Sequence, residues 1–196
     1  MQEVRPHLRA VAYKTLALLY EYPEKDIFIN SKERSYICNI FSELSKNNYF
    51  QDLTLVKIEE LFSSIQCVPL EELQAEYIRL FEYAPLCPPY ETAYINSNAS
   101  DTLLSLQELY KKFGVQTNFP YPADFLIFQV EFMSYLISLE DTLSQKEFLE
   151  RHLKVWIEHF SKCIKAHSFL AFYKLLAQLT LIFIRSDFLY LSKALL

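Results

Sequence analysis

Apolar side chains recur every three or four residues along most of the chain, which is the spacing of one face of an α-helix. Pro23 stops the first run, and Asn30 or Ser31 is placed to cap the second. Pro69 suits the first turn of the fourth run, because its ring fixes φ and a first-turn N–H has no helical partner. The pattern predicts four helices in the first half of the chain, at about 8–20, 31–47, 55–64 and 69–83.

The second half of the chain shows the same periodicity. Asp101 is a candidate N-cap, and Gly114, the single glycine, stands where a helix commonly ends in a left-handed residue. The dipeptides Asn-Gly and Asp-Gly, which mark β-hairpins, do not occur. The predicted helices cover about 101–113, 122–141, 144–166 and 168–185, with a turn or short helix after Asp187. The expected fold class is therefore all-α, with about seven to nine helices.

A proline-rich link separates the two sets of predicted helices. Pro85, Pro88 and Pro89 fix three φ angles and remove three backbone donors within a short stretch. We predict a single helical domain made of an N-terminal half, the link and a C-terminal half, at 1–83, 84–100 and 101–196. A hinge of this kind lets two copies exchange halves, so the sequence is compatible with both a monomer and a hinge-swapped dimer.

The composition excludes several classes of protein. Hydrophobic residues make up 52% of the 196 residues and charged residues 22%, which argues against an intrinsically disordered chain. A net charge of −5 argues against a nucleic-acid binder, because such proteins gather Lys and Arg to contact phosphates. One glycine is too few for a P-loop or for a dinucleotide-binding loop.

The residue types that carry out catalysis or bind metals show no arrangement typical of either. Acidic neighbours such as Glu140 and Asp141 diverge by ~100° on a helix, so we assign no catalytic residue and expect no enzymatic activity. His152 and His159 lack further ligands at metal-binding spacing, so we expect no metal site and assign no cofactor.

Cysteine usage and the apolar segments bear on the compartment. The N-terminus has no signal-peptide h-region or cleavage site, so we expect a cytoplasmic protein. The apolar run 169–184 is shorter than the ~20 residues that cross a bilayer, which predicts a core helix and no stable membrane insertion. The four cysteines are Cys38, Cys67, Cys87 and Cys163. They lie far apart and form no Cys-x-x-Cys pair, which predicts buried reduced thiols rather than a disulfide framework or a zinc site.

Several short motifs follow one another over most of the chain. They are Tyr77-x-x-Leu80-Phe81, the link segment 88–94 (Pro-Pro-Tyr-Glu-Thr-Ala-Tyr), Pro122-x-Asp124, the segment 130–136 and Phe148-Leu149-x-x-His152-Leu153-x-x-Trp156. In their order and spacing the chain resembles the TorD-like chaperones of molybdoenzyme maturation, which include the DmsD and NarJ branches. Phe125 stands where the family's Pro-x-Asp-His pattern has histidine, so any role of that histidine is not carried over.

The resemblance implies a chaperone that binds the signal peptide or the apo form of a molybdopterin oxidoreductase subunit and assists its maturation before export or assembly. The implied partner is the catalytic subunit of that enzyme, and no nucleic acid is expected. Two alternatives stay open. One is a NarJ-type assembly chaperone for a client that is not exported, and the other is a helical scaffold or regulatory protein that binds a partner helix.

The resemblance also implies a site for a twin-arginine signal peptide. Such a peptide needs carboxylates, which engage guanidinium groups bidentately, beside an apolar groove. Asp124 and Glu131 lie two turns apart on one predicted helix face, and Glu91 arrives from the link. The competing interpretation of Asp124 is a first-turn residue that the helix dipole stabilises. The predicted aromatic contacts with the peptide are Tyr90, Tyr94, Tyr121, Phe125 and Phe128.

Overall fold

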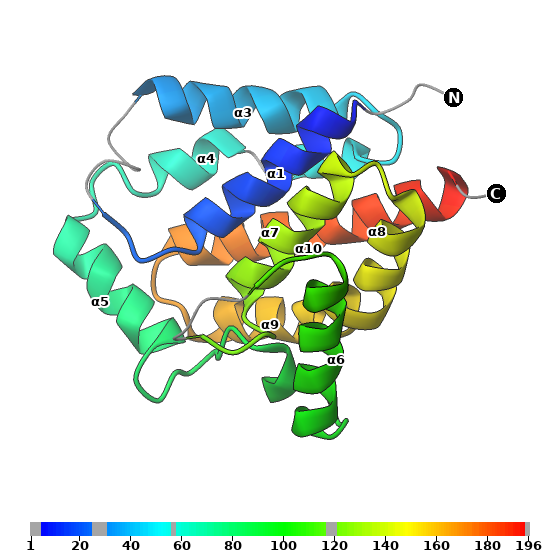
Figure 1. Ribbon diagram of the computed structural model, residues 1–196. Helices are drawn as coiled ribbons and strands as arrows, with labels where there is room; N and C mark the ends of the chain where they lie inside the picture. The colour runs from blue at the N-terminus through cyan, green and yellow to red at the C-terminus, as the bar shows by residue number, and fades with distance from the viewer. Residues whose placement is uncertain (1–4, 25–30, 56–57, 117–120, 195–196) are drawn as a thin grey trace.

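Helix α1 (Pro6–Leu19) lies along α7 (Leu126–Ser138), so the first helix of the chain packs on its second half (Figure 1). The computed structural model describes residues 5–24, 31–55, 58–116 and 121–194. The last helix, α10 (Ala171–Ala194), packs against α9 (Lys154–His167) and also contacts α4 (Ile58–Ser63). These contacts support our proposal of a single domain, because both predicted halves contribute to one hydrophobic core.

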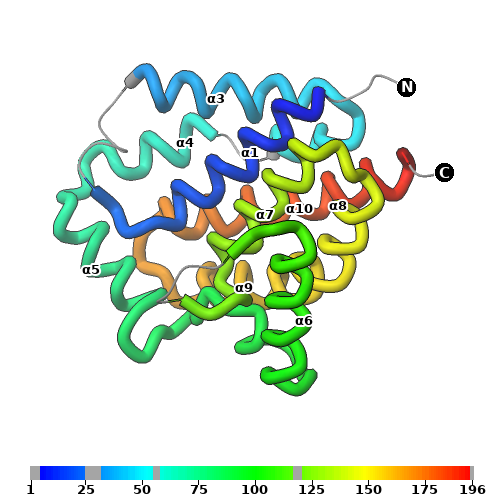
Figure 2. The backbone as a smooth tube through the Cα atoms, in the orientation of Figure 1, coloured from blue at the N-terminus to red at the C-terminus, as the bar shows by residue number. Residues whose placement is uncertain are grey.

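The other helices surround these central ones. They are α3 (Ser31–Ser45), the 3₁₀ helix η1 (Gln51–Leu55), α5 (Leu70–Phe81), the 3₁₀ turn η2 (Glu91–Ala93), α6 (Ala99–Lys112), α8 (Thr142–Phe148) and the π-helical turn η3 (Leu149–Leu153). In Figure 2, α3 and α4 lie above α1 and α6 lies below it. The predicted all-α fold is confirmed: the described ranges contain one isolated β-bridge and no strand.

Several predicted helix starts differ from the observed ones, and two of the differences have a clear cause. Helix α6 is capped by Asn98 rather than Asp101, and the Asn98 side-chain oxygen accepts a hydrogen bond from Ser100 N at 3.1 Å. Helix α7 begins at Leu126 instead of at 122, because the residues before it pair with the link. Asp124 therefore precedes the first turn, and the interpretation of this residue as a first-turn anion is wrong.

A buried ion pair joins α1 to α10. The Arg9 guanidinium donates from Nε to Asp187 Oδ1 at 2.5 Å and from Nη2 to Oδ2 at 2.9 Å, and the Tyr13 hydroxyl donates to Oδ2 at 2.9 Å. The Arg9 side chain is 4% exposed and the Asp187 side chain is fully buried. The start of α1 and the end of α10 consequently lie on the same side of the molecule (Figure 1). The predicted helix end before Asp187 is wrong, since α10 continues to Ala194.

A second buried carboxylate, Glu76, holds α5 to the turn between α9 and α10. It accepts hydrogen bonds from Arg79 at 2.7 and 2.8 Å, from Ser168 Oγ at 2.9 Å and from Phe169 N at 2.6 Å. Burial alone would raise the pKa of Glu76, but these hydrogen bonds outweigh burial and lower the pKa below its usual value. The residues predicted to pack the inner face of α5 are buried: Tyr77, Leu80 and Phe81.

Helix α10 is longer than the sequence pattern indicated. It spans 24 residues, and among the described residues it is the one helix that is long and apolar enough to cross a membrane by length and composition. In the most apolar 18-residue stretch of α10, 56% is buried inside the protein, which fits the predicted core helix.

Replacing Arg9 should reveal how strongly α1 and α10 depend on their ion pair. Arg9→Met leaves the buried Asp187 carboxylate without its charged partner, and we expect the free energy of unfolding to fall by about 3 to 5 kcal/mol in urea denaturation. The double variant Arg9→Met/Asp187→Leu should regain most of that loss. Lys14→Met, on the exposed face of α1, is the control and should change little. A loss no larger than that of the control would contradict this role.

Candidate functional site

The link pairs with the segment that precedes α7. The backbone N–H of Glu91 donates to the Asp124 carbonyl oxygen at 3.2 Å, and that of Leu126 donates to the Pro89 carbonyl oxygen at 2.9 Å. Tyr90 and Phe125 form an isolated antiparallel β-bridge between these bonds. The pairing brings the link motif and the Pro-x-Asp motif together, as a common site requires.

Asp124 lies inside the protein and holds the link. Its side chain is 1% exposed, and its Oδ2 accepts hydrogen bonds from Thr92 N at 2.9 Å and Thr92 Oγ1 at 2.6 Å. Within the described part of the chain, the buried Oδ1 has no hydrogen-bond partner. In this arrangement the Asp124 carboxylate faces the link and is closed to solvent.

Glu91 is also buried, at 1% exposure, in a network of polar side chains beneath the link. It accepts a hydrogen bond from Gln129 Nε2 at 2.5 Å, and His152 Nδ1 lies 3.2 Å from both of its carboxylate oxygens. Trp156 Nε1 donates to Gln129 Oε1 at 3.0 Å. The network connects the link to α7 and to the helical run that contains η3 and α9. Its geometry gives Glu91 a structural role.

Four of the predicted aromatic residues form one cluster, which we call the aromatic surface: Tyr90, Tyr121, Phe125 and Phe128. The Tyr121 ring stacks on Phe125 with centroids 4.5 Å apart, and the Phe128 ring meets Phe125 edge-on at 5.6 Å. The Tyr90 and Phe125 centroids are 5.6 Å apart. Tyr121 is 42% exposed, so the cluster reaches the protein surface.

Tyr94, the fifth predicted aromatic residue, does not join the aromatic surface. Its ring stacks on Trp156 with centroids 5.8 Å apart and meets Phe160 at 6.0 Å. It is partly buried and packs against the hydrophobic core, so its position supports packing of the link rather than peptide contact.

Glu131, by contrast, is exposed and stands at a cleft of about 320 Å³ that adjoins the aromatic surface. This volume lies in the range of pockets that hold small ligands or side chains. The cleft lies between α7 and the end of α6, and Phe128 belongs to both the cleft and the aromatic surface. The residues that line the cleft are Tyr110, Val115, Gln116, Phe128, Glu131, Phe132 and Tyr135.

Further carboxylates stand near Glu131. The pKa of Glu21 is raised, first by partial burial and then by the negative charges of Glu131 and Glu24. Glu21 and Glu24 follow α1 and are exposed, as Glu131 is on α7. The pKa of Tyr90 is likewise raised, first by burial and then by the neighbouring Tyr121, Asp124 and Glu82. The surroundings of the aromatic surface are therefore acidic and favour a cation.

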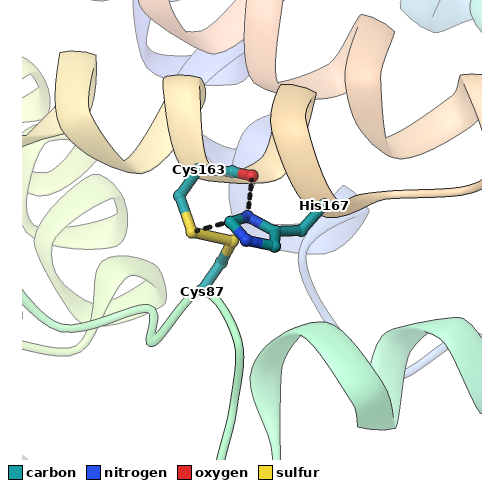
Figure 3. Close-up of side chains that lie close together, drawn as sticks. All are labelled: Cys87, Cys163 and His167. Carbon is teal, nitrogen blue, oxygen red and sulfur yellow. Dashed lines mark hydrogen bonds between the residues drawn. A yellow bond between two sulfur atoms is a disulfide. The ribbon is translucent and has the colours of Figure 1, made fainter.

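A disulfide joins Cys87 of the link to Cys163 of α9, with Cα atoms 5.7 Å apart (Figure 3). The prediction that these two residues are reduced thiols is wrong. Folding brings them together across a sequence separation of 76, which spacing along the chain does not reveal. Cys38 and Cys67 are free thiols, but Cys38 is only partly buried and Cys67 is exposed, so the prediction of buried thiols is wrong for both.

Sequence reasoning missed several residues of this region. Gln129 and Trp156 complete the Glu91 network, but Gln129 lies in a segment that resembles an ordinary apolar helix, and Trp156, which ends one of the family motifs, was not predicted to belong to the site. One signal was present: Gln129 is a lone polar residue within the apolar segment 125–130, and a buried amide needs partners. The missed residues of the cleft are Tyr110, Val115, Gln116, Phe132 and Tyr135.

Comparisons with known proteins agree on one family. Residues 51–162 match the family model described as nitrate reductase delta subunit. Chaperone protein TorD of Shewanella oneidensis is 25% identical over 195 residues, covering 92% of this chain and 89% of the relative. Chaperone protein TorD of Vibrio parahaemolyticus is 28% identical over 140 residues, covering 61% of this chain and 64% of the relative.

The fold also has a solved counterpart. The crystal structure of an Archaeoglobus fulgidus protein described as a redox enzyme maturation protein superposes with a TM-score of 0.56 at 21% identity, covering 92% of this chain and 96% of the other. That identity supports a shared fold, and the family model and the curated relatives support the relationship. The chain therefore belongs to the nitrate reductase delta subunit family, is similar to the TorD chaperones over most of its length, and does not belong to a family of enzymes.

Proposed function

We propose that this protein is a cytoplasmic chaperone that binds the arginine-containing N-terminal signal segment of a molybdoenzyme catalytic subunit and assists its maturation. The observation that carries the proposal is the continuity of the aromatic surface with the cleft at Glu131. Family membership supports the chaperone role, and the acidic, aromatic chemistry of this surface supports the choice of peptide.

The chemistry of the surface matches the two parts of such a segment. Arginine guanidinium groups stack on aromatic rings and pair with carboxylates, and Tyr121 and Glu131 offer both to solvent. The apolar stretch that follows the arginines needs an apolar groove, and the cleft supplies one between Phe128 and Tyr135. Asp124 and Glu91, which we expected to contact arginine directly, support the surface from within by holding the link.

A second cleft, of about 510 Å³, lies between the link, α6 and the helical run of η3 and α9. Its wall includes the exposed Asp101 and the buried Glu91, but it also includes Arg151, whose positive charge opposes that of an arginine side chain. Among the described residues, those that line the cleft at Glu131 include no basic side chain. We therefore place the arginines at Glu131.

Charge reversal at the cleft tests this placement. Glu131→Lys replaces an attractive charge with a repulsive one, and we expect at least tenfold weaker binding of an Arg-Arg signal peptide in calorimetric titration, about 1.4 kcal/mol or more. Glu150→Lys, an exposed residue of η3 that does not line the cleft, makes the same change in net charge and should bind normally. Equal affinities for the two variants would overturn the placement.

The same titration with a Lys-Lys peptide separates the proposal from its alternatives. Selective loss of binding supports recognition of a twin-arginine segment. Unchanged binding would indicate a NarJ-type client without an exported signal. If removing the protein from cells left molybdoenzyme activity and cofactor content unchanged, a helical scaffold would be the better interpretation.

Asp124→Asn separates support of the surface from peptide contact. The substitution weakens the charge-assisted bonds to Thr92, so we expect urea denaturation to show a loss of about 1.5 to 3 kcal/mol in stability. Peptide affinity of the folded variant should stay within about twofold of the parent, because the carboxylate is buried. Asp52→Asn, at an exposed acid of η1, is the control. Intact stability with lost affinity would show that Asp124 contacts the peptide.

A further inference from the structure

Two sulfur atoms and an imidazole lie together where the link meets α9. Cys87 is fully buried, Cys163 is half-buried, and His167 follows Cys163 by one helical turn (Figure 3). One ligand atom from each of the three residues lies within 4.8 Å of those of the other two. Two thiolates and an imidazole are the ligand types that zinc prefers.

We propose that the reduced Cys87–Cys163 pair, together with His167, binds one Zn²⁺ ion, and that formation of the disulfide releases it. This site is separate from the proposed peptide surface, and its test does not depend on the client. Zinc is favoured over Mg²⁺ or Ca²⁺ because those ions take oxygen ligands. With three protein ligands, the fourth tetrahedral position of the zinc ion is left to water. Because His167 is exposed, we expect this fourth position to face solvent.

The local geometry is compatible with both states of the cysteine pair. Tetrahedral zinc with ~2.3 Å Zn–S bonds holds its two sulfurs about 3.8 Å apart. Cysteines whose Cα atoms are 5.7 Å apart reach that separation by small side-chain rotations, since their sulfurs are already adjacent. His167 Nδ1 lies 3.7 Å from Cys163 Sγ and 3.0 Å from the Cys163 carbonyl oxygen, so the imidazole already stands beside the sulfur atoms.

Exchange between the two states balances as a thiol–disulfide reaction. The oxidant is a low-molecular-weight disulfide. Its S–S bond breaks and accepts two electrons to give two small thiolates, while the Cys87 and Cys163 thiolates lose two electrons and form their own S–S bond. The protein then lacks two of its three ligands, and Zn²⁺ leaves. Both the disulfide and the zinc ion would hold Cys87 of the link to α9. Cys87 lies three residues before Tyr90.

Metal titration of the full chain tests the proposal. The protein is reduced with a phosphine, which avoids competition from thiols, and is titrated anaerobically with Zn²⁺ against a chromophoric chelator. We expect one equivalent of zinc to bind, and Co²⁺ in its place to show cobalt–thiolate charge-transfer absorption. Cys163→Ser and His167→Ala should each weaken binding more than tenfold, whereas Cys67→Ser, a free exposed cysteine, should not.

Oxidation completes the test. Adding oxidised glutathione to the zinc-loaded protein should release the metal together with a mass loss of two hydrogen atoms and protection of two cysteines from alkylation. The Cys163→Ser variant, checked for folding by circular dichroism, should show neither change. Failure of the reduced protein to bind zinc, equal binding by Cys163→Ser, or undiminished binding by the disulfide form would overturn the proposal.

Discussion

The pairing of the link with the segment before α7 is the constraint on which the candidate site depends. Two backbone hydrogen bonds flank the Tyr90–Phe125 bridge, and the Asp124 carboxylate adds two more to Thr92. Pro85, Pro88 and Pro89 lack backbone donors, so the stretch of the link before Tyr90 cannot form an α-helix that would compete with this arrangement. The bridge places the Tyr90 ring on Phe125 and directs the Glu91 side chain inward to Gln129 and His152. The aromatic surface and the buried network around Glu91 therefore both depend on this one local pairing.

Buried carboxylates tie distant parts of the chain together elsewhere in the fold. Asp187 holds α1 to α10, and Glu76 holds α5 to the turn after α9. A carboxylate inside a protein is stable only with donors around it, so each of these residues fixes the relative position of the helices that supply its donors. The exposed Glu131 does not hold two helices together in the described part of the chain, so its carboxylate is available to a ligand.

The helical fold was predictable because a 3.6-residue period is a local property of the sequence. Gly114 illustrates this: its φ of 72° is the left-handed conformation expected at the end of α6. Residues brought together by folding were harder to predict. Arg9 and Asp187 are 178 positions apart, and an aspartate within an apolar run looks like a helix end until its partner is known. The motifs led us to expect Tyr90, Phe125 and Phe128 at one site, and their rings do lie close together. Local pattern does not report burial, so Asp124 and Glu91 were expected to contact the peptide, whereas both are buried.

Site-specific photo-crosslinking is the most direct test of where the client segment binds. A benzophenone amino acid replaces Tyr121 of the aromatic surface in one variant and the exposed Tyr36 of α3 in the other. Each variant is irradiated with an Arg-Arg signal peptide from a molybdoenzyme of the same organism. We expect an adduct from position 121 and none from position 36. An adduct from position 36, with none from position 121, would contradict this expectation.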